Sequence, residues 1–335
     1  MFFWMVFALL VAIAIVITPT GKLVAVKCQL YADGVVFMAK AEDLPKTYRG
    51  TNYIPMKTIG DGTRGKRTIR VIFIRHGQSV WNSLFNSFNI GLPVRLAKAA
   101  ARELTDFFTN PFDSCIIDSP LSSKGKREAQ DLASFMRTAK TKISFDPTTS
   151  VVVSSNLRRA METALVGLSP RLTVTQERIV IDSALQEGTQ NIDAQSLSTE
   201  TGKIAPCKLG TITDPLKLSL VFDPYLNTGN RVAGVDVYQR MDKFITHLFG
   251  GSGAANLVPA AGGSNAALKE VIVVGHSGYF RNFFRRFLPP HSTHISKKSK
   301  MQNAAVVVFE LTRDESSNEI SVDESTLKVL YKGFS

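Results

Sequence analysis

The sequence predicts an α/β fold, a three-layer sandwich in which a mainly parallel sheet carries helices on both faces. With 335 residues, of which 44% are hydrophobic, the chain can bury one large core. Such sheets place their functional sites at the carboxyl ends of the strands. The prediction rests on segments that read as strands and helices in alternation, at 68–75, 123–138, 151–168, 231–249, 269–288 and 304–312.

The first strand delivers an arginine and a histidine to a glycine turn, in the order Arg75-His76-Gly77. An apolar run rich in β-branched residues that ends in this way is typical of a buried strand with reactive side chains at its end. Neutral imidazole is a nucleophile toward phosphorus, and an adjacent guanidinium binds phosphoryl oxygens through a bidentate fork. The Arg75 charge also disfavours the imidazolium form of His76, so the sequence predicts a neutral nucleophile.

A second apolar strand runs into a turn and a helix over residues 151–164. The turn offers Ser154, Ser155 or Asn156 as a helix N-cap. Arg159 follows within the first helical turns, where the side chain and the helix dipole both favour a bound anion. The neighbouring Arg158 is interpreted as a solvated charge on the outer face of that helix.

Two further segments bring a carboxylate and a second histidine. Glu187 lies beside a glycine in a loop-like stretch, with Glu177 and Asp193 as the nearest alternative acids. Residues 269–279 again read as a strand and a glycine turn, and this one ends in His276. A helix is expected to follow, over Tyr279–Leu288.

Taken in order, these segments resemble the histidine phosphatase (phosphoglycerate mutase-like) superfamily, in patches over residues 68–312. Ser277 stands where the acid phosphatase and phytase branch carries aspartate, so the resemblance is to the branch that contains the mutases. It implies the phosphoglycerate mutase-like fold. The motifs that carry it are Arg75-His76-Gly77, Leu157-Arg158-Arg159-Ala160, Leu185-Gln186-Glu187 and Gly275-His276-Ser277-Gly278.

The resemblance implies a mechanism for these residues. His76 attacks the phosphoryl group and becomes a phosphohistidine, and Glu187 protonates the leaving oxygen before deprotonating the water that resolves the intermediate. Positive charge on arginines and a second histidine takes the place of a metal ion, so neither a metal nor another cofactor is implied. The oxygens of the transferring group are held by Arg75, Asn82, Arg159 and His276.

Other chemistries fit the sequence less well. Gly275-His276-Ser277-Gly278-Tyr279 nearly matches the Gly-x-Ser-x-Gly elbow of acyl hydrolases, but it ends in tyrosine. The pair His291 and His294 has helical spacing without an acid or a cysteine to complete a metal site. The three cysteines are scattered singly, which fits a reducing compartment and indicates neither zinc nor a disulfide framework.

The charge balance suits a phosphorylated substrate. Forty Lys and Arg against 28 acids give a formal net charge of +12. No nucleic-acid motif accompanies this excess, so nucleic acid is not expected as a partner. A basic segment, Arg281–Lys300, follows His276 directly, and it is read either as a solvated basic face or as a roof over the pocket.

Residues 1–19 are predicted to be a single-pass membrane anchor. Met1–Ile17 contains no charged side chain, and as a helix it spans about 26 Å of a hydrocarbon core that is about 30 Å thick. Trp4 suits the interface, and lysines lie only on the carboxyl side, which predicts a cytosolic catalytic domain. A cleaved signal peptide and a buried helix are the alternatives.

Residues 20–66 are predicted to be an N-terminal extension and linker, ahead of a catalytic domain at 67–335. Within the extension, Val24–Met38 is expected to form a hairpin across Ala32-Asp33-Gly34. An insertion, Ser83–Ser119, contains an expected helix over Pro93–Thr109 and is expected to border the phosphate site.

The sequence thus predicts a membrane-anchored phosphomonoester hydrolase that acts through a phosphohistidine. A phosphoglycerate mutase-type phosphotransferase and a catalytically inactive membrane adaptor remain as alternatives. The shared motifs read only the phosphoryl group, so they leave the physiological substrate, the membrane and the oligomeric state open.

Overall fold

A computed structural model describes residues 3–7, 13, 18–40, 42–44, 65–85, 90–210, 215–250 and 255–335. Over these residues seven strands form one sheet, in the order β4-β3-β2-β5-β1-β6-β7. The strands are β1 (Lys66–Arg75), β2 (Ser150–Ser154), β3 (Ile179–Asp182), β4 (Phe222–Leu226), β5 (Glu270–Gly275), β6 (Val306–Asp314) and β7 (Ile320–Tyr331).

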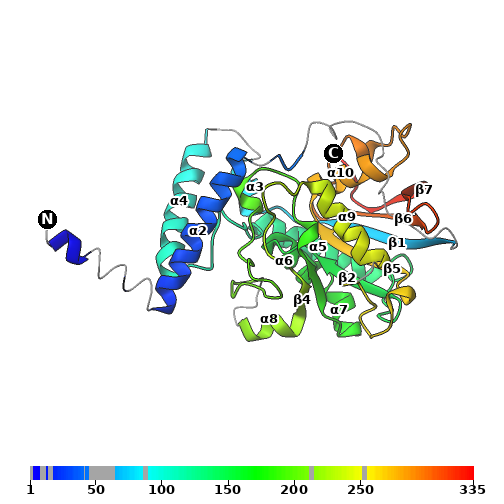
Figure 1. Cartoon of the computed structure of the whole chain (residues 1–335), viewed down its shortest axis with the longest axis horizontal. Coiled ribbons are helices and arrows are strands. Elements are labelled where there is room, and N and C mark those ends of the chain that lie inside the picture. The colour runs from blue at the N-terminus through cyan, green and yellow to red at the C-terminus, as the bar shows by residue number, and fades with distance from the viewer. Residues whose placement is uncertain are drawn as a thin grey trace.

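The sheet is mixed and mostly parallel, as the alternation of elements predicts. Parallel pairs join β1 to β5, β5 to β2, β2 to β3 and β3 to β4. At one side of the sheet, β6 pairs antiparallel with both β1 and β7. The register sets Arg75 opposite Gly275 and Ser154 opposite Val274. Three of the predicted functional segments therefore leave the sheet side by side at one edge (Figure 1).

Two apolar cores lie on opposite faces of the sheet, so the described chain forms three layers. Phe73 faces α9 (Val237–Phe249) and α10 (Ser277–Phe287), and its ring stacks on that of Phe280 with 4.0 Å between centroids. Ile72, on the opposite face, packs toward α5 (Ser123–Thr138) and α6 (Arg158–Gly167). The period of two along β1 produces this division. Shorter helices complete the layers, namely α3 (Val80–Phe85), α7 (Ser169–Thr175) and α8 (Pro215–Val221).

Several local expectations are confirmed with small shifts. The expected insertion helix is α4 (Leu92–Thr109), and α10 begins two residues before the expected Tyr279. The N-cap of α6 is Leu157, which makes no side-chain capping bond, so the prediction of Ser154, Ser155 or Asn156 was wrong. Instead, the hydroxyl group of Ser155 is hydrogen-bonded to His276.

The expected hairpin in the extension was also wrong, because residues Pro19–Lys40 form one helix, α2. Its valines suit a strand, but its buried positions recur at helical spacing, with Leu30, Gly34 and Phe37 facing the domain. α2 packs beside α4 at one end of the molecule (Figure 1). The buried Lys27 on α2 pairs with Glu103 on α4 at 3.0 Å.

The predicted membrane anchor lies mostly outside the described residues, which include only 3–7, 13, 18 and 19 of residues 1–19. Where the chain is described, no helix combines the length and apolarity that a bilayer crossing requires. The anchor stays a prediction.

Candidate active site

The turn after β1 is held tightly against the domain. The His76 amide donates to Gly275 O at 2.9 Å, which continues the pairing of β1 with β5. The Gly77 amide donates to Thr163 Oγ1 on α6 at 3.1 Å. A Cβ at Gly77 would lie 2.6 Å from the Gly125 carbonyl oxygen, so only glycine allows α5 to approach this closely. These contacts fix the histidine against the sheet edge.

The two predicted histidines meet at this edge. The rings of His76 and His276 lie 5.1 Å apart between centroids, at 59° to each other, and both side chains are buried. His76 Nδ1 lies 2.5 Å from Gly77 O. Since a carbonyl oxygen only accepts, Nδ1 carries the proton and the lone pair is on Nε2. His76 is thus arranged as a nucleophile through Nε2.

His276 supplies a second imidazole behind the first. Its Nε2 lies 2.9 Å from Ser155 Oγ, and its Nδ1 has no hydrogen-bond partner among the described residues. Burial lowers the pKa of His76 well below its usual value, and the charges of Arg159 and Arg75 lower it further. Burial and the Arg159 charge lower the pKa of His276 in the same way. Both rings are therefore neutral at neutral pH, as the sequence predicts for His76.

Two guanidiniums, those of Arg75 and Arg159, flank His76. Arg75, at the end of β1, donates through Nη1 to Met301 O at 2.5 Å, and its Nε has no partner where the chain is described. Arg159, the second residue of α6, donates through Nη1 to Asp193 O at 2.9 Å and pairs with the Asp193 carboxylate at 3.3 Å. Asp193, an alternative acid from the sequence, thus orients Arg159.

The carboxylate of Glu187 is bound at the N-terminus of α10. Its Oε1 accepts from the Tyr279 amide at 2.9 Å, and its Oε2 accepts from the Gly278 amide at 3.4 Å. Backbone amides at a helix N-terminus suit a negatively charged group. A Cβ at Gly278 would lie 2.6 Å from Glu187 Oε1, so the glycine makes room for the carboxylate.

One cavity of about 1030 Å³ brings these groups together. Five of the six predicted site residues line it, and the sixth, His276, lies behind His76. The five are Arg75, His76, Asn82, Arg159 and Glu187. Asn82 comes from α3, which also contributes Trp81 and Phe85, whose rings lie 4.3 Å apart. Phe85 belongs to the insertion Ser83–Ser119, so the insertion borders the cavity at that residue, whereas α4 contributes no described residue to the lining.

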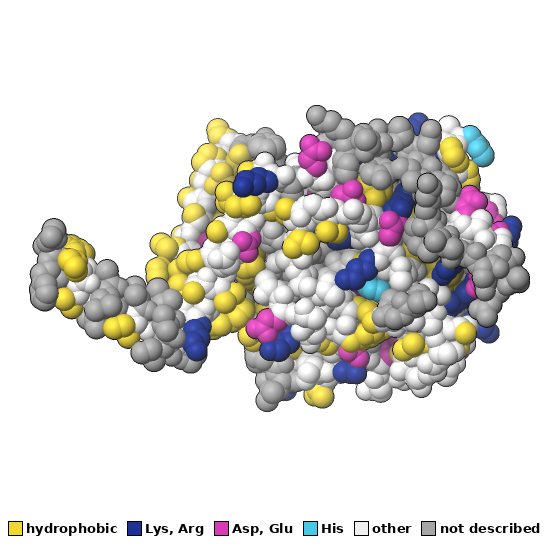
Figure 2. All heavy atoms as spheres, viewed as in Figure 1, with side chains coloured by type: hydrophobic (Ala, Val, Ile, Leu, Met, Phe, Trp, Pro, Cys, Tyr) yellow, Lys and Arg dark blue, Asp and Glu magenta, His cyan; other side chains and the backbone are white. Residues whose placement is uncertain are grey.

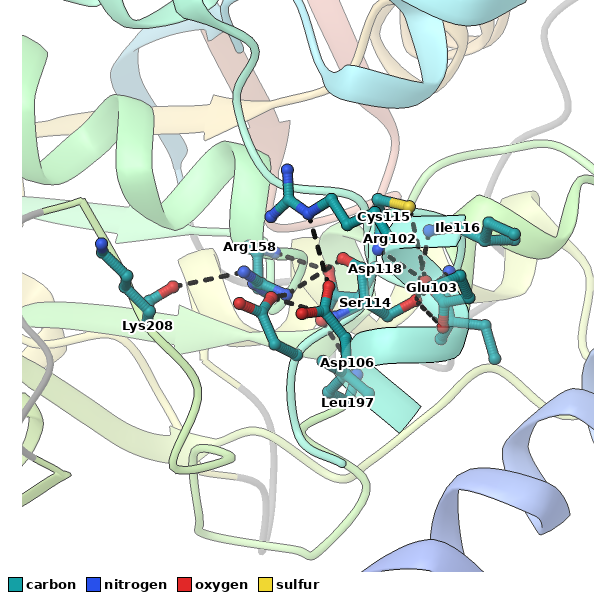
Figure 3. A network of polar contacts seen from close by, with 12 residues as sticks. Arg102, Glu103, Asp106, Ser114, Cys115, Ile116, Asp118, Arg158, Leu197 and Lys208 are labelled. Carbon is teal, nitrogen blue, oxygen red and sulfur yellow. Dashed lines mark hydrogen bonds and ion pairs between the residues drawn. The ribbon is translucent and has the colours of Figure 1, made fainter. Parts of the chain in front are cut away.

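Arg158 is buried and ion-paired, so its interpretation as a solvated charge on the helix was wrong. Its side chain is 3% exposed and pairs with Asp113 at 2.7 Å. It also donates to the carbonyl oxygens of Ser114 and Lys208. Figure 3 shows this network beside Asp118, whose carboxylate accepts from the Arg158 amide at 2.6 Å. Burial raises the pKa of Asp118 to about 6. Arg158 therefore ties the insertion to α6.

The other candidates fall outside the cavity or at its mouth. Glu177 is buried in an ion pair with Arg171, and His294 hydrogen-bonds Ser296 within its own turn. At the two ends of the basic segment, Arg281 and Lys300 line the cavity. No cluster of three or more His, Cys, Asp or Glu that could hold a metal ion occurs in the described parts of the chain.

Sequence reasoning missed the contribution of the N-terminal extension. Glu42 and Leu44 line the cavity, and Asp43 between them is buried. No motif marks these residues, and the side-chain partners of Asp43 lie 188 and 197 residues away in the sequence. Thr163 was missed as well, although its place one turn after Arg159 on the same helix face offered a signal.

Comparisons with known proteins bear on the fold. No family model and no curated protein sequence matches this chain. Among solved structures, a mycobacterial glucosyl-3-phosphoglycerate phosphatase complexed with VO3 is 17% identical, with a TM-score of 0.38 over 76% of this chain and 97% of that one. A phosphoglycerate mutase from Bacillus anthracis is 17% identical, with a TM-score of 0.38 over 77% and 93%. The ecdysone phosphate phosphatase from Bombix mori, in complex with tungstate, is 16% identical, with a TM-score of 0.35 over 78% and 91%.

These three structures are 16–17% identical to the chain, with TM-scores of 0.35–0.38, so the chemistry has to be argued from the cavity itself.

Proposed function

We propose that this protein is a phosphomonoester hydrolase that works through a phosphohistidine on His76. The supporting observation is the convergence of two neutral imidazoles, two guanidiniums and one carboxylate around a single cavity. These groups come from four separate segments, yet they match the needs of one reaction. A phosphoryl group placed against His76 Nε2 meets cations from Arg75 and Arg159 where charge concentrates in the transition state.

In the first step the Nε2 lone pair attacks phosphorus and the bond to the leaving oxygen breaks. Glu187, in its protonated form, gives its proton to that oxygen, so a neutral alcohol departs. Arg75, Arg159 and Asn82, which line the cavity, hold the equatorial oxygens, and His276 lies against the His76 ring from behind. In the second step Glu187 takes a proton from water as the water oxygen attacks phosphorus. The bond between phosphorus and Nε2 breaks, its electron pair returns to Nε2, and neutral His76 and inorganic phosphate are released.

The decisive experiment is to trap the intermediate. Wild-type protein quenched during turnover of a phosphomonoester should carry acid-labile phosphate on the peptide that contains His76. His76→Ala should carry none and should lose at least a hundredfold in kcat. His291→Gln, which alters an exposed histidine outside the cavity, serves as the matched control and should behave as wild type. Full activity of His76→Ala would end the proposal.

A membrane location is a separate part of the proposal. It is supported by apolar side chains that gather over α2 and α4 on the face in Figure 2. Exposed apolar residues recur on both helices, and residues 3–7 are exposed and apolar as well. Those on the two helices include Val26, Val35, Val36, Met38, Val94, Leu96, Leu104 and Phe108. Exposed apolar area of this kind favours contact with lipid or protein.

The membrane proposal is tested on the full chain in cells. We expect the protein to stay in the membrane pellet through carbonate extraction. A protease added to sealed vesicles from the cytosolic side should degrade the domain, which sits in the cytosol in this proposal. Release by carbonate would contradict the anchor, and protection of the domain would contradict its sidedness.

A further inference from the structure

The N-terminal extension places one carboxylate deep inside the catalytic domain. Asp43 has no exposed side-chain surface and lies between two arginines of the region after β4. Arg240, on α9, binds it in bidentate fashion, with Nη1 2.5 Å from Oδ1 and Nη2 3.2 Å from Oδ2. Arg231 Nη1 lies 3.5 Å from Oδ2.

The same two guanidiniums hold the backbone of the loop that carries Glu187. Arg231 donates to Glu187 O at 3.2 Å, to Asn191 O at 2.8 Å and to Thr189 O. Arg240 Nη2 donates to Glu187 O at 3.4 Å. These three loop residues all line the cavity. The α10 amides thus fix the carboxylate of Glu187 from one side, and the two arginines fix its backbone from the other side.

The two arginines depend on Asp43 for neutralisation. The side chains of Arg231 and Arg240 are 0% and 6% exposed, and the positive charge of Arg240 lowers the pKa of Arg231. Burial lowers the pKa of Arg231 to about 10, while the Asp43 charge acts in the opposite direction. Two buried cations without their shared anion are unstable as a pair, so they would separate or admit water.

Other contacts fasten the extension at this position. Asp43 O accepts from the Val237 amide, the first residue of α9, at 3.1 Å. The Phe37 ring on α2 lies 4.1 Å from the Arg231 guanidinium, within cation–π range. Gly34 on α2 packs against Ile192, since a Cβ there would lie 2.7 Å from Ile192 Cγ1. α2 therefore covers the far side of the general-acid loop.

We infer that Asp43 is a positioning residue for the general acid, through Arg231 and Arg240, and that the N-terminal extension is part of the catalytic unit. The inference rests on the role proposed for Glu187. Asp43 touches no reacting atom in this scheme. It determines where the Glu187 backbone lies and so how well its carboxylate reaches the leaving oxygen.

The test uses the dependence of rate on the leaving group. p-Nitrophenolate leaves without a proton, because its nitro group stabilises the anion. Phenolate, whose conjugate acid has a pKa near that of tyrosine, about 10, needs protonation. The rate of enzyme phosphorylation is measured in single turnovers of the full chain with a series of substituted phenyl phosphates. Wild type should show a shallow dependence on leaving-group pKa.

Asp43→Asn should steepen that dependence, with phosphorylation by phenyl phosphate slowed about 10- to 100-fold and by p-nitrophenyl phosphate less than about 3-fold. The matched control is Asp33→Asn, which alters an exposed carboxylate on α2 and should keep the wild-type slope. Asp43→Glu, which restores the charge, should recover part of the loss. Circular dichroism on all variants reports whether the fold is retained. If Asp43→Asn is unfolded, Asp43→Glu is compared with wild type instead, and its dependence of rate on leaving-group pKa should be steeper than that of wild type and shallower than that of Glu187→Gln.

Glu187→Gln separates this inference from the proposed function. If Glu187→Gln steepens the dependence and folded Asp43 variants keep the wild-type slope, the positioning role is overturned while the proposed function stands. If Glu187→Gln itself keeps the wild-type slope, Glu187 is not the general acid and both fall. Equal slowing of all substrates in Asp43→Asn overturns the positioning role too, because a purely structural defect does not discriminate between leaving groups.

Discussion

Gly278 offers a way to displace the carboxylate of Glu187, the proposed general acid, without removing it. A Cβ at this position would lie 2.6 Å from Glu187 Oε1 and 3.2 Å from its Cδ, whereas ordinary contacts begin at 3.4 Å. Gly278 does not have a positive φ, so Gly278→Ala introduces no backbone strain. The methyl group also lies 3.3 Å from Gly188 O, which leaves the loop little room to follow. The change therefore acts on the carboxylate.

The magnitude follows from that distance. The Glu187 oxygen has to move by about 0.8 Å, and misplacement of a catalytic group by about 1 Å costs on the order of a hundredfold in rate. We expect Gly278→Ala to lower kcat/KM for phenyl phosphate about 30- to 100-fold. The loss for p-nitrophenyl phosphate should be a few-fold, because that leaving group departs without a proton. Removal of the carboxylate in Glu187→Gln should cost more, within the 10²- to 10⁴-fold range of general acid catalysis.

Steady-state assays with the two substrates measure this difference. Gly65→Ala is the matched control, since a Cβ at Gly65 has no atom within 4 Å and should leave both rates unchanged. Wild-type rates of Gly278→Ala on phenyl phosphate would refute the reasoning. They would mean either that the carboxylate does not act where the structure places it or that its displacement has no consequence.

Three further predictions concern stability. First, His76 and His276 have lowered pKa values, so the stability that their neutral forms contribute is fully present above about pH 6.5. Below that pH the free energy of unfolding falls by up to about 1.4 kcal/mol per pH unit for each ring, and the raised pKa of Asp118 partly offsets the loss. Urea unfolding at pH 7 and pH 5 measures this slope, and His276→Gln should reduce it. Second, Arg158→Leu leaves the Asp113 carboxylate unpaired and should lower the free energy of unfolding by about 3–5 kcal/mol, whereas a change below about 1 kcal/mol in urea titrations would contradict the network. Third, a fragment 60–335 lacks Asp43 and should unfold at lower urea concentration and have lower activity than a fragment 18–335; equal behaviour of the two would show that the extension is dispensable.

The catalytic motifs were readable because each is local. A strand, a glycine turn and a helix start determine where Arg75, His76 and His276 lie, and the parallel register of β1 and β5 then brings the two histidines together. Glu187 is bound by the α10 amides of Gly278 and Tyr279, two and three residues after His276, which is again a contact with a recognised segment. Hydrophobic periodicity alone was enough to place α4 and α5 within a residue or two.

The errors arose where the deciding partner is distant in sequence. Arg158 looked solvated because the sequence shows only that Arg159 is adjacent, whereas its partner Asp113 lies 45 residues earlier in an insertion. The valine-rich α2 suits a strand by composition, and only its packing against α4 and the general-acid loop selects the helix. Asp43 carried no signal, because its arginines lie 188 and 197 residues away.

These observations together explain why the N-terminal extension, which carries Asp43, contributes to the site. His76, the proposed nucleophile, is fixed by the sheet, since β1 pairs on both sides and its amides are bonded to β5 and β6. Glu187, the proposed general acid, lies on a loop, which has no strand register to fix it, so the backbone carbonyls of that loop need donors from elsewhere. Arg231 and Arg240 supply those donors in a buried place, and buried cations require a buried anion. Asp43 is that anion, so in the proposed mechanism the accuracy of proton transfer at Glu187 depends on the segment that precedes the first strand.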